Sequence, residues 1–177
     1  MNKRIAIDMD QVIADTLVSL LDYYNKQYDD CLTEKDLYGK KLREVAKCGI
    51  QVQELYKIPK FFKELKVMEH SQEVIRELSK HYEIFITTAA MEVPTSFTEK
   101  YEWLNEHFPF IPDSHIVFCG DKSIIHADYL IDDSPRHFTR FKGQGILYTA
   151  PHNLHVTGYT RVNSWKDVAD MFLQSTL

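Results

Sequence analysis

The chain has 177 residues and a net charge of −5, and 44% of its residues are hydrophobic while 27% are charged. This is the composition of an ordinary globular protein, and no apolar stretch approaches the roughly 20 residues of a membrane span. The negative charge argues against a protein that binds nucleic acid by neutralising its phosphates. Three cysteines without a CxxC pair predict free thiols in a reducing cytoplasm.

The first predicted strand, residues 4–8 (RIAID), ends directly on acidic residues. Asp8 and Asp10 are separated by a single residue. Two like charges at ~4 Å repel each other by about 4 kcal/mol at an effective dielectric constant of ~20. We therefore expect either a bound cation or a raised pKa at this place.

A long segment without a clear strand follows the first strand. Its beginning has a helical pattern, and its second part, residues 40–66, carries eight Lys or Arg against three Glu. Such a basic segment could attract a small anion, although a solvated helical face is the commoner use of most such lysines. We expect a small helical cap at residues 15–68, inserted into a core domain formed by residues 1–14 and 69–177.

Strands and helices alternate through the remainder of the chain. Strand-length apolar runs occupy residues 83–88, 115–119, 129–132 and 146–149, with a weaker candidate at 159–162. Helical periodicity appears at residues 71–82 and 96–108 and in a final helix with Val168, Met171 and Phe172. The expected helix caps are Ser71, Ser134 (followed by Pro135) and either Asn163 or Ser164. This alternation predicts an α/β fold, with a mostly parallel sheet covered by helices on both faces.

Polar side chains stand where four of these strands end. After the acid pair of the first strand, Thr88 ends the second, Lys122 follows the third, and Asp132 and Asp133 end the fourth. Ligands of open parallel sheets bind beyond the carboxyl ends of the strands, so these groups should meet in one crevice. Hard oxygen ligands suit Mg²⁺, and the lysine and the hydroxyl could receive a phosphate beside the ion.

Such a group of side chains can hydrolyse a phosphate monoester. One carboxylate can attack phosphorus and form an aspartyl-phosphate. A second carboxylate can protonate the leaving oxygen and later activate water. Each residue alone has an ordinary structural explanation, but their joint order along the chain favours a catalytic site.

The same motifs resemble those of the haloacid-dehalogenase (HAD) superfamily of phosphatases. DMDQV is similar to the first motif of that superfamily, FITTA to the second, GDK to the lysine motif and LIDD to the fourth. FFKELKVMEHSQEVIREL, EKYEWLNEHFPFI and GDKSIIHADYLIDDSPR resemble more closely the 5′(3′)-deoxyribonucleotidase family. The resemblance covers roughly residues 3–15 and 58–140, and it implies a Rossmann-like HAD core.

The resemblance also implies which residues act at the metal. Asp8 would be the nucleophile and a Mg²⁺ ligand. Asp10 would be the general acid/base and would offer its backbone carbonyl to the ion. Asp133 would ligate the metal directly, with Asp132 beside it in the outer shell or also ligating.

The phosphate-binding residues implied by the resemblance are Thr88, Ala89 and Lys122. Three departures from the family pattern accompany them. Gln11 stands where the first motif usually has Gly, Thr16 replaces an aromatic residue that helps to hold the base, and Ala89 replaces a common Ser. The segment 15–68 also lacks the Phe-Trp pair that family members use for base stacking. Phosphatase chemistry survives these changes, whereas the nucleotide assignment is weakened.

Several other residues have plainer expected roles. His152 and His155 have a spacing that could bind a metal, but without a third ligand we expect loop or surface roles. Cys119 is expected to be a small buried residue. Trp103 and Trp165 are expected to pack on helix faces. The aromatic residues that could offer another stacking surface, although such spacing is more often that of a core, are Tyr24, Tyr38, Tyr56, Phe61 and Phe62.

The favoured function is a Mg²⁺-dependent phosphomonoesterase acting on (deoxy)nucleoside monophosphates through an aspartyl-phosphate. The same chemistry on a sugar phosphate or another small metabolite is the first alternative. A receiver-type signalling domain is a second, but there the lysine comes last along the chain, whereas here it precedes the final acid pair. A non-catalytic binding protein would be expected to lack Asp8 or Asp10. We expect a small phosphorylated partner, and neither nucleic acid nor membrane.

Overall fold

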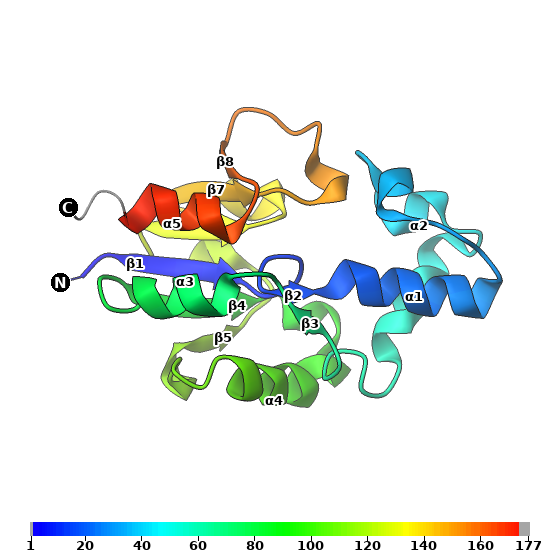
Figure 1. Cartoon of the computed structure of the whole chain (residues 1–177), viewed down its shortest axis with the longest axis horizontal. Coiled ribbons are helices and arrows are strands. Elements are labelled where there is room, and N and C mark those ends of the chain that lie inside the picture. Colours follow the sequence, from blue (N-terminus) through cyan, green and yellow to red (C-terminus); the bar gives the residue numbers. More distant parts are fainter. Residues whose placement is uncertain (1, 174–177) are drawn as a thin grey trace.

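The computed structural model describes residues 2–173, which form a six-stranded sheet beside a small two-stranded one (Figure 1). The strand order of the large sheet is β5-β4-β1-β6-β7-β8, and every neighbouring pair is parallel. The predicted α/β fold is therefore confirmed. The strands of the large sheet are β1 Arg4–Asp8, β4 Glu83–Thr88, β5 Ile116–Phe118, β6 Tyr129–Asp132, β7 Gln144–Tyr148 and β8 Thr160–Val162.

Both α-helices and short 3-10 helices connect these strands. The α-helices are α1 Thr16–Tyr28, α2 Leu42–Val45, α3 Ser71–Leu78, α4 Phe97–His107 and α5 Trp165–Leu173. The 3-10 helices are η1 Glu34–Leu37, η2 Gly49–Lys57, η3 Ala90–Glu92, η4 Pro94–Ser96, η5 Asp113–His115, η6 Lys122–Ile124, η7 Pro135–Phe138 and η8 Pro151–Asn153. Within residues 2–173, no helix has both the length and the apolar character that a membrane span requires.

The alternation of side chains along β1 separates two cores. Ile5 and Ile7 face the larger one, to which α3, α4 and α5 contribute their apolar faces. Ala6 faces a smaller cluster that contains Phe138 and Phe141. Figure 1 shows α3 and α5 side by side over the sheet. Long helices therefore cover one face, and the short helix η7 with its loops covers the other.

The helix starts differ in part from the expected ones. The predicted cap at Ser71 is wrong, because His70, with a φ of 65°, occupies the cap position and Ser71 is the first helical residue. The Ser71 hydroxyl instead donates to the Met68 carbonyl at 2.7 Å and closes the preceding turn. Ser164 does accept a hydrogen bond from the Asp167 amide, at 3.3 Å. The predicted start of η7, Ser134 followed by Pro135, is confirmed.

The chain leaves the core through β2 (Ala14–Asp15) and returns through β3 (Lys66–Val67), which pair antiparallel. The expectation that residues 15–68 hold no strand was wrong, because a two-residue strand leaves no periodic signal. Between β2 and β3, the segment with α1, η1, α2 and η2 extends away from the large sheet (Figure 1). We call residues 15–68 the insert; its treatment as a separate cap domain stays a prediction.

Candidate active site

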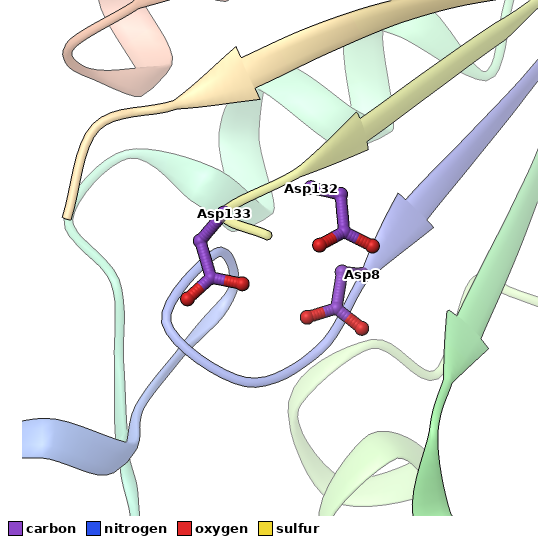
Figure 2. Close-up of side chains that lie close together, drawn as sticks. All are labelled: Asp8, Asp132 and Asp133. Carbon is purple, nitrogen blue, oxygen red and sulfur yellow. The ribbon is translucent and has the colours of Figure 1, made fainter. Parts of the chain in front are cut away.

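Three carboxylates converge beyond the ends of β1 and β6. The two strands pair in parallel, so Asp8, the last residue of β1, lies beside the end of β6, where Asp132 and Asp133 follow each other. Figure 2 shows these three side chains turned toward one another, and one oxygen of each lies within 4.8 Å of the others. The structure thus brings Asp8 of the first acid pair together with both members of the second pair.

Burial changes the affinity of Asp8 and Asp133 for protons. All three carboxylates are buried, and burial raises the pKa of Asp8 to about 7, with the charges of Asp132 and Asp10 adding to the shift and Lys122 opposing it. Burial likewise raises the pKa of Asp133 well above its usual range. A raised pKa lowers the charge that Asp8 and Asp133 carry and so limits the repulsion between them.

Lys122 lies beneath the cluster and joins its members. Its Nζ donates to the carboxylate of Asp8 and, at 2.6 Å, to that of Asp132. Burial alone would lower the pKa of Lys122, but these two carboxylates outweigh it and raise the pKa. Helix η6 places the lysine, and the Asp121 side chain opens that helix by accepting from the Ser123 amide at 2.9 Å. The lysine predicted from the third strand end is therefore a buried ammonium in direct contact with the nucleophile candidate.

Asp10 is held separately from Asp8. The Thr16 hydroxyl donates to one of its carboxylate oxygens at 3.1 Å, and the Lys100 ammonium donates to the other. The same ammonium donates to Oγ1 of Thr88 at 3.0 Å. Of the two threonines, Thr88 is therefore the one whose hydroxyl bonds to a side chain of the site.

Lys100 is absent from the residues predicted to form the site. A lysine in the middle of a helix is usually solvated, and only its spacing could have revealed it. It lies three and four residues before Trp103 and Leu104, which is on the buried face of α4.

The turn after β1 carries the first departure from the family pattern. Gln11 has a φ of 64°, in the left-handed region that favours glycine. The main-chain amide of Gln11 donates to the Ala14 carbonyl at 2.8 Å. The Met9 carbonyl accepts from the main-chain amides of Ile13 and Ala14 at 3.0 and 2.9 Å. These bonds fix the turn that presents Asp10, so the chain tolerates a strained residue there.

A pocket of about 310 Å³ opens over these side chains, a size suited to a small ligand. Its sheet side includes Asp8, Asp10, Asp132, Asp133 and Ala89. Its insert side carries the apolar side chains of Leu17, Leu20, Leu37, Leu42 and Val52. The cations Lys40, Lys41 and Arg43 also line this side. Thr88 and Lys122 are fully buried behind the sheet side. The pocket therefore has a charged wall and an apolar wall.

Two of the aromatic side chains considered for stacking line this pocket. They are Tyr56 and Phe62, whose rings stack on each other with centroids 6.0 Å apart. Tyr24 and Phe61 are buried in the larger core, and Tyr38 is exposed. The insert thus offers one aromatic pair at the pocket, at positions that the spacing alone did not distinguish.

His152, in the short helix η8, also lines the pocket. Its Nε2 lies 3.6 Å from the carboxylate of Asp133, and burial lowers its pKa, with the nearby Lys41 adding to the shift. His155 is exposed, as expected. The expected burial of Cys119, and of both tryptophans on helices, is confirmed.

Comparisons with known proteins agree with this geometry. The family model described as 5′ nucleotidase, deoxy (Pyrimidine), cytosolic type C protein matches residues 2–177. A Staphylococcus aureus (strain Mu50) protein, provisionally named a 5′(3′)-deoxyribonucleotidase, is 50% identical over 175 residues, which cover 98% of this chain and 97% of the relative. The 5′(3′)-deoxyribonucleotidase of Bacillus subtilis (strain 168) is 42% identical over 168 residues, 95% of this chain and 97% of the relative.

Solved structures agree on the fold. A haloacid-dehalogenase-like hydrolase from Streptococcus pneumoniae superposes with a TM-score of 0.65 at 14% identity, covering 97% of this chain and 98% of the other. This likeness supports the HAD-type core expected from the motifs. The chain, which carries these motifs at the ends of its parallel strands, therefore belongs to the 5′(3′)-deoxyribonucleotidase family.

Proposed function

We propose that this phosphatase is a Mg²⁺-dependent enzyme that removes phosphate from (deoxy)nucleoside monophosphates through an aspartyl-phosphate on Asp8. The observation that carries the proposal is the convergence of Asp8, Asp132 and Asp133 over Lys122 at one wall of the pocket. Family membership supports the nucleotide as substrate class and disfavours a receiver domain or a mere binding protein. We further propose that it works in the cytoplasm.

The donor set fits Mg²⁺. The carboxylates are hard oxygen ligands, and the two acid pairs carry four of them against the ammonium groups of Lys100 and Lys122, an excess that one divalent cation would balance. When bound, Mg²⁺ would offset the repulsion between the carboxylates and polarise the substrate phosphate. Asp8, Asp133 and the backbone carbonyl of Asp10 are the residues that we propose to hold it.

The hydrogen bonds of the last acid pair support different roles for its members. Both oxygens of Asp132 are used, one by Lys122 and the other by the Ser134 amide at 2.8 Å. Within residues 2–173, the carboxylate of Asp133 accepts no hydrogen bond, and the imidazole Nε2 of His152 lies 3.6 Å from it. We therefore propose Asp133 as a direct metal ligand and Asp132 as an outer-shell group that orients Lys122.

The chain's own residues can divide the reaction as follows. The Asp8 carboxylate attacks phosphorus, the bond to the ester oxygen breaks, and Asp10 gives that oxygen a proton. Asp10 then takes a proton from water, which attacks phosphorus and releases phosphate, restoring the Asp8 carboxylate. Lys122 fixes Asp8 throughout, while Ala89, which lines the pocket just after β4, lies where phosphoryl oxygens would be received, with the Thr88 hydroxyl buried behind it.

The pocket's apolar wall supports a leaving group with a flat apolar face. Tyr56, with the buried Phe62 stacked on it, provides aromatic surface there, and the leucines of the insert extend it. The hydroxyl of Thr16, which replaces the usual aromatic residue, turns to Asp10 instead of toward a base. Because Thr16 offers no aromatic ring to a base, a smaller leaving group, such as that of a sugar phosphate, remains the second candidate.

The test is phosphate release from 5′ and 3′ deoxyribonucleotides, ribonucleotides and sugar phosphates, with Mg²⁺ or with EDTA. Asp8→Asn should abolish release, and Asp113→Asn, a carboxylate that instead bonds the Tyr101 hydroxyl, should not. Asp10→Asn should accumulate phosphate covalently bound to Asp8, detected by mass spectrometry. Release that persists in Asp8→Asn, or that is equal in EDTA, would overturn the mechanism. A preference for sugar phosphates would move the substrate to the second candidate.

A further inference from the structure

We propose that Lys100 and Thr16 are positioning residues that clamp Asp10 from two sides and hold it over the reacting phosphate. The inference rests on the proposed role of Asp10 as general acid/base. It assigns a task to a buried lysine that the mechanism above does not use.

Lys100 is in an unusual place for a lysine. It is 3% exposed, on the face of α4 that carries Trp103 and Leu104 into the core. A charged side chain is almost never so buried unless it is paired, and an apolar residue of similar volume often gives equal or greater stability. Lys63, which also bridges to α4, is instead half-exposed and pairs with Glu102 at 2.8 Å. Lys63 shows that an exposed lysine is enough to join the insert to α4. The burial of Lys100 therefore needs another explanation.

Of the three groups around the Lys100 ammonium, Asp10 and Phe62 line the pocket and Thr88 is buried behind it. The ammonium donates to the Asp10 carboxylate and to the Thr88 hydroxyl at 3.0 Å. It also lies 4.6 Å from the centroid of the Phe62 ring, within range of a cation–π interaction. The anion, the hydroxyl and the ring come from three separate segments, so the lysine can occupy one place only.

The two contacts on Asp10 form the clamp. Thr16 donates to Oδ1 and Lys100 donates to Oδ2, so rotation of the carboxylate about its last bond would break both. A carboxylate has about four lone-pair sites, so two remain to exchange a proton. The Asp10 side chain is 31% exposed and lines the pocket, where a leaving oxygen would arrive. Proton transfer requires such pre-set geometry.

The clamp is independent of Lys122. Lys122 donates to Asp8 and Asp132, and Lys100 donates to Asp10 and Thr88. Each of the two reacting carboxylates therefore has its own lysine. The loss of Lys100 should then affect proton delivery to the leaving group more than attack by Asp8.

The experiment compares two substrates in Lys100→Met, Thr16→Val and the control Lys63→Met. A deoxynucleoside monophosphate has a poor leaving group that needs a proton, whereas p-nitrophenyl phosphate leaves without one. We expect Lys100→Met to lower kcat/KM about 100-fold for the nucleotide, the lower range of general acid catalysis, and less than about 5-fold for the aryl ester. Thr16→Val should show the same selectivity at about 10-fold, and Lys63→Met should change neither value.

Other outcomes overturn the clamp. An equal loss for both substrates in Lys100→Met and Thr16→Val would indicate a structural role only. A raised KM and weaker inhibition by inorganic phosphate, with kcat retained, would make Lys100 a phosphate contact. If Lys100→Met does not fold, as judged by thermal unfolding, Thr16→Val decides, and equal losses in it refute the clamp. An inactive wild type would refute the proposed function itself, which separates that failure from a failure of the clamp.

Discussion

The two walls of the pocket are held by different kinds of interaction. On the sheet side, Asp8 and Asp132 are buried, in places that the register of the parallel strands dictates, and both accept from the buried ammonium of Lys122. On the insert side, Lys40 and Arg43 are exposed, and within residues 2–173 their side chains form no ion pair. One wall is a closed network of charges, and the other combines apolar side chains with a set of independent cations.

This difference determines which substitutions each wall can accept without loss of stability. Removing one partner from a buried ion pair leaves an uncompensated charge and is costly, whereas an exposed charge contributes little to stability. Exposed cations can still attract an anionic ligand from a distance. The sheet side should therefore couple catalysis to stability, and the insert side should adjust substrate capture alone.

The largest expected difference between the two walls is the loss of stability when one lysine is removed from each. Lys122→Met leaves the carboxylates of Asp8 and Asp132 without their ammonium, so we expect a loss of about 3–5 kcal/mol in the free energy of unfolding. Lys41→Met on the opposite wall should cost less than about 1 kcal/mol. Urea unfolding of both variants without Mg²⁺ measures this, and equal losses would show that the two walls do not differ.

The sheet-side wall should also make stability depend on pH and Mg²⁺ together. Asp8 has a pKa of about 7 in the folded protein, above its unfolded value of about 3.9. Without metal, the folded state binds more protons between these values, so the free energy of unfolding should fall as pH rises through this window and level off above about 7. Mg²⁺ needs deprotonated carboxylates, so the stabilisation it gives should grow over the same window, by roughly 1–3 kcal/mol.

Thermal unfolding at pH 5 to 8, with and without Mg²⁺, checks this dependence. Asp8→Asn removes the titrating group and serves as the control, because its metal-free stability should vary less with pH. Equal stabilisation by Mg²⁺ at pH 5 and pH 8 would contradict the prediction.

The exposed cations should show the opposite behaviour. Replacing Lys40, Lys41 and Arg43 together with Gln should lower kcat/KM about 3- to 10-fold at low salt, with kcat and stability unchanged. High salt screens long-range attraction, so the difference from wild type should disappear near 0.5 M salt. A loss of kcat/KM that persists at high salt would mean direct contact with the substrate. Steady-state kinetics against ionic strength makes the distinction.

The smallest expected effect concerns the turn after β1. Gln11→Gly would relieve a left-handed backbone conformation, partly offset by the greater freedom of glycine in the unfolded chain. We expect a gain of about 0.5–1 kcal/mol, seen as a higher Tm. A lower Tm would show that the Gln11 side chain, which lines the pocket, contributes more than its backbone costs.

The sheet-side wall was largely predictable from sequence, for a physical reason. Each apolar run predicts a buried strand. The parallel arrangement brings the ends of these strands, at Asp8, Thr88 and Asp132, to one edge of the sheet. The catalytic and ligand roles given to these residues stay proposals, as does the cytoplasmic location inferred from the cysteines.

The insert-side wall and the clamp could not be predicted in the same way. The helical pattern of α1 was recognised, but the rest of the insert consists of η1, α2 and η2, and such short or 3-10 elements carry little periodicity. Lys100 meets Asp10 across 90 positions of the sequence, and nothing local distinguishes it from a solvated lysine. The insert's return through Lys66–Val67 is likewise fixed by its pairing partner and not by its own residues.

The central place of β1 has a consequence for biosynthesis. This strand is made first, yet its neighbours begin only at Glu83 and Tyr129. Pairing of such distant parallel strands is slow, and until both have left the ribosome the Ile5 and Ile7 side chains lack the strands that flank them. A nascent chain stalled before residue 129 therefore exposes the very strand that ends in Asp8, and should depend on chaperones more than the finished protein does.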